Sequence, residues 1–187
     1  QAVLEPDGSV RLLRPQALVR SYEARAANAE GRGQVTMGDL LNQSLRDSPD
    51  VIVVGETRGA DVVHLLDAAS NGVAGVMCTI HAVSARGVFD RVVQMVRKAD
   101  PPLPADFALM ASTALDVIVH VARNRAYERF VTEVVQVHSG QLGETGYPVT
   151  EQLFAPRGDG RAVPTGHKPT PEFAQRLLDV GFDLNWL

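Results

Sequence analysis

Short apolar runs alternate with stretches of helical spacing over the first two thirds of the chain. Val51–Val54 is apolar at every position and Val76–Ile80 is nearly so, which is typical of strands buried on both faces. A third run, Val117–Val121, follows a helix predicted around residues 105–115. Because strand alternates with helix up to that point, the pattern predicts an α/β fold with a mostly parallel sheet.

Local signals mark the ends of the earlier predicted helices. Thr36, with Asp39 three residues later, resembles a capping box at the start of the first helix. Asn71-Gly72 ends the second helix, and Ser84 caps the third. The predicted core face of the third helix consists of Val88, Val92, Met95 and Val96.

Beyond residue 121 the pattern changes to an alternation of apolar and polar positions. Residues 130–137 alternate in this way, a turn is predicted around His138-Ser139-Gly140, and a further strand is predicted near residues 149–154. Strands joined by tight turns predict an antiparallel meander.

The last 32 residues divide into a linker and a helix. Residues 156–169 are rich in Gly, Pro and charge and are predicted to form a loop or linker. Thr170 is placed as the N-cap of a terminal helix, with Pro171 at its first position and Gly181 at its end.

Composition places the chain among globular proteins and excludes several classes. Its 187 residues are 45% hydrophobic and 21% charged, so disorder and collagen-like repeats are excluded. The formal net charge of −4 gives no electrostatic footprint for nucleic acid. A single cysteine, Cys78, cannot form an internal disulfide, which indicates a reducing, cytosolic setting. The chain begins with Gln1, so we expect it to be a piece of a longer or processed protein.

The two lysines exclude a phosphate-binding loop within these residues. Neither Lys98 nor Lys168 follows a glycine-rich turn, and neither precedes Ser or Thr in the pattern G-x-x-x-x-G-K-[ST]. A stand-alone P-loop NTPase is therefore excluded on sequence.

The strongest chemical signal is a carboxylate at the end of a predicted buried strand. Glu56 follows Val51–Val54 and Gly55, and Arg58 brings a positive charge two residues later. Open α/β sheets bind their ligands at the carboxyl ends of the strands, so Glu56 is a candidate catalytic residue. The alternative is a strand that simply leaves the core into a charged loop.

The second signal lies at the end of the next predicted strand. Thr79 and His81 leave the sheet at the edge where Glu56 is expected, so the three side chains would share one site. The alternative for a lone histidine is a satisfied structural role, and Cys78 is most simply a small buried hydrophobe. No residues have zinc-ligand spacing, and no Ser-His-Asp arrangement follows from spacing.

Three blocks of sequence together resemble a known family. They are residues 20–36 with a Glu-Gly-Arg-Gly turn, residues 45–59 around Gly55-Glu56, and residues 71–86 around His81. From Val19 to Ala85 the chain resembles the second half of the core domain of type II/type IV secretion ATPases, nearest the pilus-assembly branch called Tad or Cpa. Weaker similarity continues to about residue 155.

The resemblance implies a fold, an assembly and a location. Residues 1–155 would form the second half of a RecA-like ATPase core without its P-loop, and residues 156–187 the linker and C-terminal helix. The parent protein would be a homohexamer that hydrolyses ATP with Mg²⁺ to drive pilus biogenesis or protein secretion. It would lie in the cytoplasm, peripheral at the inner face of the membrane, with inner-membrane platform proteins as partners and no nucleic acid.

The resemblance also assigns roles to six residues. Glu56 would hold the water shell of Mg²⁺, and His81 would sense the γ-phosphate. Arg20 and Arg25 would reach a phosphate, including that of a neighbouring subunit, as charge-stabilising arginines do. The catalytic set is Glu56, His81 and Arg58, and the nucleotide-binding set is Arg20, Arg25 and Thr79.

Two departures from the family leave alternatives open. The family's P-loop would lie upstream of Gln1, so we expect the strand edge beside Val76–Ile80 to be unpaired. The family also has an acidic box with two glutamates, the second of which is thought to act as general base. In this chain Ser9 stands at the position of that second glutamate, and an alignment shifted by one or two residues would place Asp7 there instead. The alternative function is therefore a non-hydrolysing scaffold. A conjugation-type DNA motor is disfavoured because the chain is acidic and lacks a basic stripe.

Overall fold

The structure is a computed structural model that describes residues 2–4, 10–12, 18–73 and 75–186. Residues 1–40 and 41–187 form two compact units, which we describe separately. The functional boundary expected at residue 155 stays a prediction. The acidic box, residues 5–9, lies outside the described residues.

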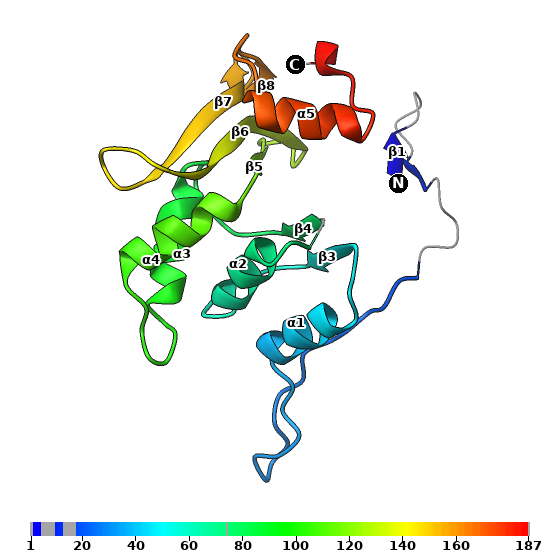
Figure 1. Cartoon of the computed structure of the whole chain (residues 1–187), viewed down its shortest axis with the longest axis vertical. Helices are drawn as coiled ribbons and strands as arrows, with labels where there is room; N and C mark the ends of the chain where they lie inside the picture. Colours follow the sequence, from blue (N-terminus) through cyan, green and yellow to red (C-terminus); the bar gives the residue numbers. More distant parts are fainter. Residues whose placement is uncertain (1, 5–9, 13–17, 74, 187) are drawn as a thin grey trace. The chain divides into compact units, whose positions relative to one another are not determined.

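The first unit contains a short hairpin and a long exposed loop (Figure 1). Strands β1 (Ala2–Leu4) and β2 (Val10–Leu12) pair antiparallel. In the loop that follows, the amides and carbonyls of Arg25 and Val35 exchange two hydrogen bonds of 2.9 Å. Asn28 closes the tip, because its side-chain oxygen accepts the amides two and four residues later at 3.1 and 2.8 Å.

Helix α1 (Met37–Arg46) begins at the predicted capping box. The Thr36 amide donates to Asp39 Oδ2 at 2.8 Å, and the Asp39 amide donates to Thr36 Oγ1 at 3.1 Å. Each side chain therefore satisfies an amide that the first helical turn leaves without a partner, and the prediction is confirmed.

The second unit opens with a parallel pair of strands joined by a helix (Figure 1). Strand β3 (Val51–Val54) pairs in parallel with β4 (Gly75–Cys78), and α2 (Val62–Ser70) connects them and ends at Asn71 as predicted. Parallel neighbours need such a crossover. Among the described residues β4 pairs only with β3, so no strand of that part of the chain lies on its other edge.

The prediction that both strands are buried on two faces is wrong. Ile52 and Val54 are 6% and 4% exposed, whereas Val53 is 67% exposed and Met77 in β4 is 58% exposed. Side chains alternate across a strand, and within the described chain only one face of this pair packs into a core.

Two further helices build the main core of this unit. Helix α3 (Gly87–Val96) has the predicted face buried, and the Gly87 amide donates to Ser84 Oγ at 3.0 Å. The helix expected around 105–115 is divided into α4 (Ala105–Ala111) and a 3-10 turn, Ser112–Ala114. The core joins α2, α3, α4 and the inner side of the next sheet through Val62, Leu66, Phe89, Val92, Met95, Ala108, Ile118 and Val135.

The chain then forms the predicted antiparallel meander. Its order is β5 (Val117–Arg123), β6 (Arg129–Leu142), β7 (Pro148–Arg157) and β8 (Arg161–Pro164). β5 pairs antiparallel with β6, so the expectation that Val117–Val121 extends a parallel sheet is wrong.

Two local predictions in the meander are also corrected. The turn expected at His138–Gly140 is wrong: β6 continues to Leu142, and Gly140, with φ of +67°, lies in a register shift of the ladder. A β-bulge and a tight turn both favour a glycine with positive φ, so Gly140 gives the same sequence signal for either structure. The linker predicted at 156–169 contains β8, which pairs with the end of β7.

Helix α5 (Pro171–Asp179) lies on this sheet, held by polar contacts (Figure 1). Thr170 caps the helix as predicted and also bonds Gln136 of β6 twice, at 2.8 and 3.0 Å. Arg176 contacts Asp116 through both of its terminal nitrogens. The α/β class, the meander and the terminal helix are thereby confirmed.

Candidate functional site

The carboxyl ends of β3 and β4 bring two loops into register. The last paired residues are Val54 and Cys78, so the chains leave the parallel ladder side by side. Beyond them the Thr57 amide donates to the Thr79 carbonyl at 3.1 Å, and the Thr79 hydroxyl donates to the Gly55 carbonyl at 2.5 Å. The two loops are therefore fixed to one another past the end of the strands.

Glu56 lies between two groups that can carry positive charge. Its Oε1 is 2.8 Å from His81 Nε2, and its Oε2 is 2.6 Å from a terminal nitrogen of Arg58. The Glu56 side chain is 26% exposed, against 78% for Arg58 and 87% for His81. A partly sheltered carboxylate thus faces two side chains that reach into solvent.

This arrangement favours the ionised form of Glu56. Hydrogen bonding to Arg58 is the largest cause of a lowered pKa for the Glu56 carboxyl, and partial burial opposes it. The same contact raises the pKa of Arg58 above its ordinary value. Glu56 therefore acts as a hydrogen-bond acceptor at neutral pH.

One oxygen of this carboxylate fits a hydrated metal ion. Glu56 Oε1 is shielded from solvent and has no donor in hydrogen-bonding alignment among the described residues. Within that part of the chain, no three His, Cys, Asp or Glu side chains cluster as a metal site. A single carboxylate suits Mg²⁺, which keeps several waters and is bound through one or two acidic groups and substrate phosphates.

A partly buried contact joins the residue after Glu56 to the end of β4. Thr57 is 2% exposed, and its hydroxyl is 3.0 Å from Cys78 Sγ. Burial is the main cause of a raised pKa for the Cys78 thiol. The thiol therefore stays protonated and serves as a hydrogen-bonding group, although Cys78 is only half-buried and not the fully buried hydrophobe that the sequence suggested.

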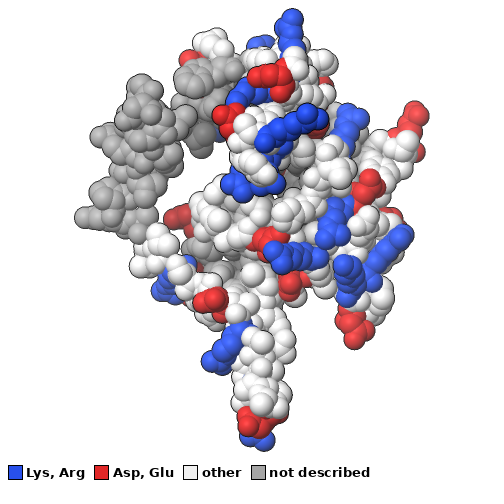
Figure 2. All heavy atoms as spheres, turned by 180° about the vertical axis from the view of Figure 1, so that it is seen from behind, with Lys and Arg blue, Asp and Glu red and all other residues white. Residues whose placement is uncertain are grey.

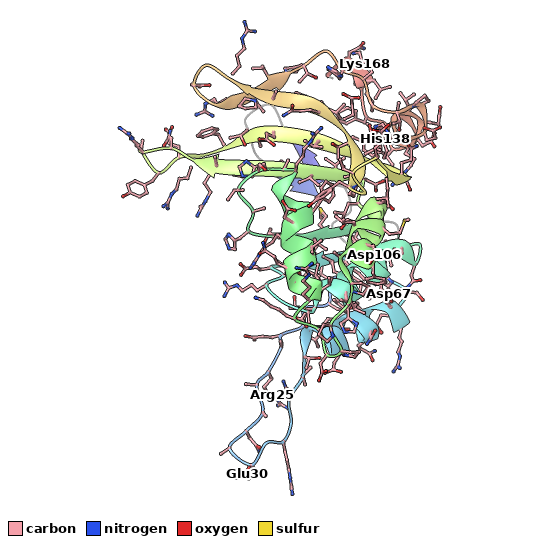
Figure 3. The ribbon with its side chains drawn as sticks, turned by 90° about the vertical axis from the view of Figure 1, so that its left-hand side faces the viewer. Arg25, Glu30, Asp67, Asp106, His138 and Lys168 are labelled. Atoms are coloured by element: carbon pink, nitrogen blue, oxygen red, sulfur yellow. The ribbon has the colours of Figure 1, made fainter. Side chains whose placement is uncertain are left out.

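The structure brings together four of the six predicted site residues. Glu56, Arg58, Thr79 and His81 meet at the strand ends, whereas Arg20 and Arg25 belong to the first unit. Figure 3 shows Arg25 on the long loop of that unit, where its Nε donates to the Gly33 carbonyl at 2.9 Å. Arg25 also lines an open hollow of about 260 Å³.

Thr57 and the Gly55 carbonyl were not identified from the sequence. Their roles depend on the register between β3 and β4, which fixes which residues face each other. The available signal was the position of Thr57, a small polar residue directly after the candidate acid.

The family model described as "Type II/IV secretion system protein" matches residues 16–155. The chain belongs to this family. Membership agrees with the α/β class of the fold, which we interpret as a partial RecA-like core. No helix within the described part of this family member is both long enough and apolar enough to cross a membrane.

Several curated relatives share this region. A Mycobacterium tuberculosis protein named for conjugal transfer is 40% identical over 118 residues, which are 63% of this chain and 33% of the relative. The type IV secretion system protein VirB11 of Brucella suis is 31% identical over 141 residues, 74% of this chain and 35% of VirB11. The chain therefore spans about a third of the length of these relatives.

A solved structure gives a partial match. The crystal structure titled as the VirB11 ATPase of the Brucella suis type IV secretion system, in complex with sulphate, has a TM-score of 0.47 and 27% identity. The match covers 52% of this chain and 32% of that one.

Proposed function

We propose that this chain supplies the hydrolytic side of the nucleotide site in an ATP-driven motor of a type II/IV secretion machine. The observation that carries the proposal is the Glu56 carboxylate at the ends of β3 and β4. Its Oε1 is sheltered and makes no aligned hydrogen bond among the described residues, and His81 Nε2 lies 2.8 Å from that same oxygen. Family membership supplies the secretion context.

Each residue of the site then has a distinct role. Glu56, kept ionised by Arg58, would hold Mg²⁺ through the water shell of the ion. When bound, Mg²⁺ would neutralise charge on the β- and γ-phosphates of ATP. His81 Nε2 can leave Glu56 and donate a hydrogen bond to a γ-phosphate oxygen, which makes it a sensor of the nucleotide state.

The remaining charge stabilisation would come from the arginines of the first unit. Arg20 and Arg25 are exposed, as groups that reach a phosphate of the same or a neighbouring subunit must be. We therefore propose a homohexamer, in which these arginines complete adjoining sites.

The phosphate cradle would come from residues outside this chain. No P-loop pattern occurs in the 187 residues, and β4 pairs only with β3 among those described. A P-loop strand paired with the free edge of β4 would place backbone amides and a lysine beside the ends of β3 and β4.

The motor would work at the inner face of the membrane. We propose a cytoplasmic, peripheral location with inner-membrane platform proteins as partners, in pilus assembly of the Tad type or in protein secretion. Nucleic acid is not part of the proposal, because the net charge is −4 and basic and acidic side chains are interspersed on the face that Figure 2 shows.

The test is Glu56→Gln in the natural full-length protein, assayed for ATP hydrolysis and thermal unfolding. Losing the charge while keeping the shape should lower kcat by a factor on the order of 10² or more. The midpoint Tm at neutral pH should fall only by the small amount that an exposed ion pair contributes, so the variant should remain folded.

Glu151→Gln is the matched control, because Glu151 also contacts a histidine, His167, but lies in β7 away from the strand ends. We expect it to keep the wild-type rate. A Glu56→Gln enzyme that also keeps that rate would contradict the proposal.

A non-hydrolysing scaffold is the second candidate, favoured by Ser9 in the acidic box. It predicts that the natural protein hydrolyses no ATP, and that Glu56→Gln and His81→Ala change stability alone. The ATPase reading predicts instead that His81→Ala weakens the coupling of nucleotide to assembly more than nucleotide binding.

A further inference from the structure

We infer that Thr57 and Thr79 are positioning residues that hold Glu56 and His81 at a fixed separation. The inference rests on the proposed function for its catalytic consequence. Its structural content is a set of hydrogen bonds between the two loops that leave β3 and β4, which we call the loop clamp.

Three contacts make up the loop clamp. The Thr57 amide donates to the Thr79 carbonyl at 3.1 Å, and the Thr79 hydroxyl donates to the Gly55 carbonyl at 2.5 Å. The Thr57 hydroxyl lies 3.0 Å from Cys78 Sγ. Two of the three therefore use hydroxyl groups that a change to valine removes without a change of shape.

The clamp lies where the sheet itself no longer constrains the chain. Strand pairing ends at Val54 and Cys78, yet Glu56 and His81 lie two and three residues further on. Without a cross-link, loops of this kind sample many backbone conformations. The clamp ties the residues on both sides of Glu56 to the loop that carries His81.

Burial shelters one end of the clamp, the Thr57 side chain, whereas Thr79 and its hydrogen bond to Gly55 are exposed. Thr57 is 2% exposed, although Glu56 before it is partly exposed and Arg58 after it is exposed. A buried hydroxyl needs a partner, and Cys78 Sγ provides one. The Thr79 hydroxyl has a single proton, which it gives to Gly55, so the inference assigns Thr79 a positioning role in place of the nucleotide-binding role that the resemblance implied.

The clamp should therefore affect the rate of ATP hydrolysis and not the binding of ATP. Thr57 and Thr79 set the direction in which the Glu56 carboxylate and the His81 ring point, and a misplacement of about 1 Å can cost on the order of 10² in rate. Loss of the clamp should therefore lower kcat while KM for ATP changes little.

The structural test uses the 187-residue chain and its nuclear magnetic resonance spectra. Wild type should show a through-hydrogen-bond coupling between the Thr57 nitrogen and the Thr79 carbonyl carbon. It should also show a nuclear Overhauser effect between the Glu56 side chain and the His81 ring. Thr79→Val should weaken both strongly, Thr57→Val should weaken the second, and Thr79→Ser should restore both.

Thr165→Val is the matched control, because Thr165 also donates its hydroxyl to backbone carbonyls, those of Gln152 and Leu153. It should leave both signals unchanged. Wild type without the coupling, or Thr79→Val with both signals intact, would overturn the inference. The wild-type measurement decides the matter even if the valine variants unfold.

The kinetic test uses the natural full-length protein. Thr79→Val should lower kcat by about 10- to 100-fold with KM for ATP within about twofold, and Thr79→Ser should recover most of the rate. A wild-type protein without ATPase activity would refute the proposed function while the coupling and Overhauser signals still decide the clamp. A Thr79→Val enzyme with normal kcat would refute the positioning role.

Discussion

Glu56 is held ionised by a neighbour on its own loop. Arg58 approaches its Oε2 to 2.6 Å and is the largest cause of the lowered pKa of the carboxyl, while partial burial acts in the opposite direction. His81 faces the other oxygen. His81 also lowers the pKa of the Glu56 carboxyl, but by less than Arg58 does.

Glu56 should make the stability of the chain depend on pH in the acid range. A carboxyl whose pKa is lower in the folded state contributes stability above its ordinary value of 4.5, and this is lost as pH falls through the lower folded value. The difference in Tm between wild type and Glu56→Gln should therefore be constant from neutral pH to about 5 and shrink below 4.5.

Arg58→Ala supplies the control for that experiment. It removes the largest cause of the shift, so the same comparison in an Arg58→Ala background should lose most of its pH dependence. A Tm difference that stays constant down to pH 3, about 1.5 units below the ordinary value of 4.5, would contradict the assignment.

The sequence was sufficient to place Glu56, Arg58 and His81 at one site, since residues that follow neighbouring parallel strands leave the sheet at one edge. It was not sufficient to identify the hydrogen bonds that join the two loops. Those bonds depend on the pairing of Val54 with Cys78, and a shift of one residue would bring different groups together.

At the scale of elements, helices were predicted more accurately than the environment of the strands. The capping box at Thr36 and the cap at Thr170 are local hydrogen-bond patterns, so the sequence alone can specify them. The exposure of Val53 and Met77 depends on what covers each face of the β3–β4 pair, which a run of apolar residues does not reveal.

The pairing of β5 illustrates the same limit. An apolar run such as Val117–Val121 fits either a parallel or an antiparallel sheet, and its partner is decided by the strand that follows. Gly140 fits a turn or a bulge equally well from the sequence, because both need its positive φ.

The attachment of α5 should depend on the Thr170 hydroxyl. It accepts from the Phe173 amide and from Gln136, a residue that is only 2% exposed. Thr170→Val removes a helix cap and leaves a buried amide without a partner, which should cost about 1–3 kcal/mol.

Urea unfolding measures this cost, and Thr170→Ser is the control. Serine keeps the hydroxyl, so it should stay within about 0.5 kcal/mol of wild type. Equal stability of the valine variant and wild type would mean that the cap and the Gln136 contact do not hold the helix.

At the scale of the whole molecule, this chain alone should not bind ATP with micromolar affinity. Its residues include no P-loop, so the β- and γ-phosphates would lack their backbone amides and lysine. Calorimetry on the 187-residue chain should therefore detect no micromolar binding, and a clear micromolar isotherm would show that phosphates are held in another way.

The central claim is that Glu56 meets the water shell of the nucleotide's metal ion. Its most direct test is a crystal structure of the natural full-length protein with Mg²⁺ and a non-hydrolysable ATP analogue. Our account predicts that Glu56 Oε1 accepts a hydrogen bond from a Mg²⁺-bound water and that His81 turns toward the terminal phosphate. The account would be contradicted if nucleotide and metal were bound without contact to Glu56 and the Glu56 carboxylate still lay against His81.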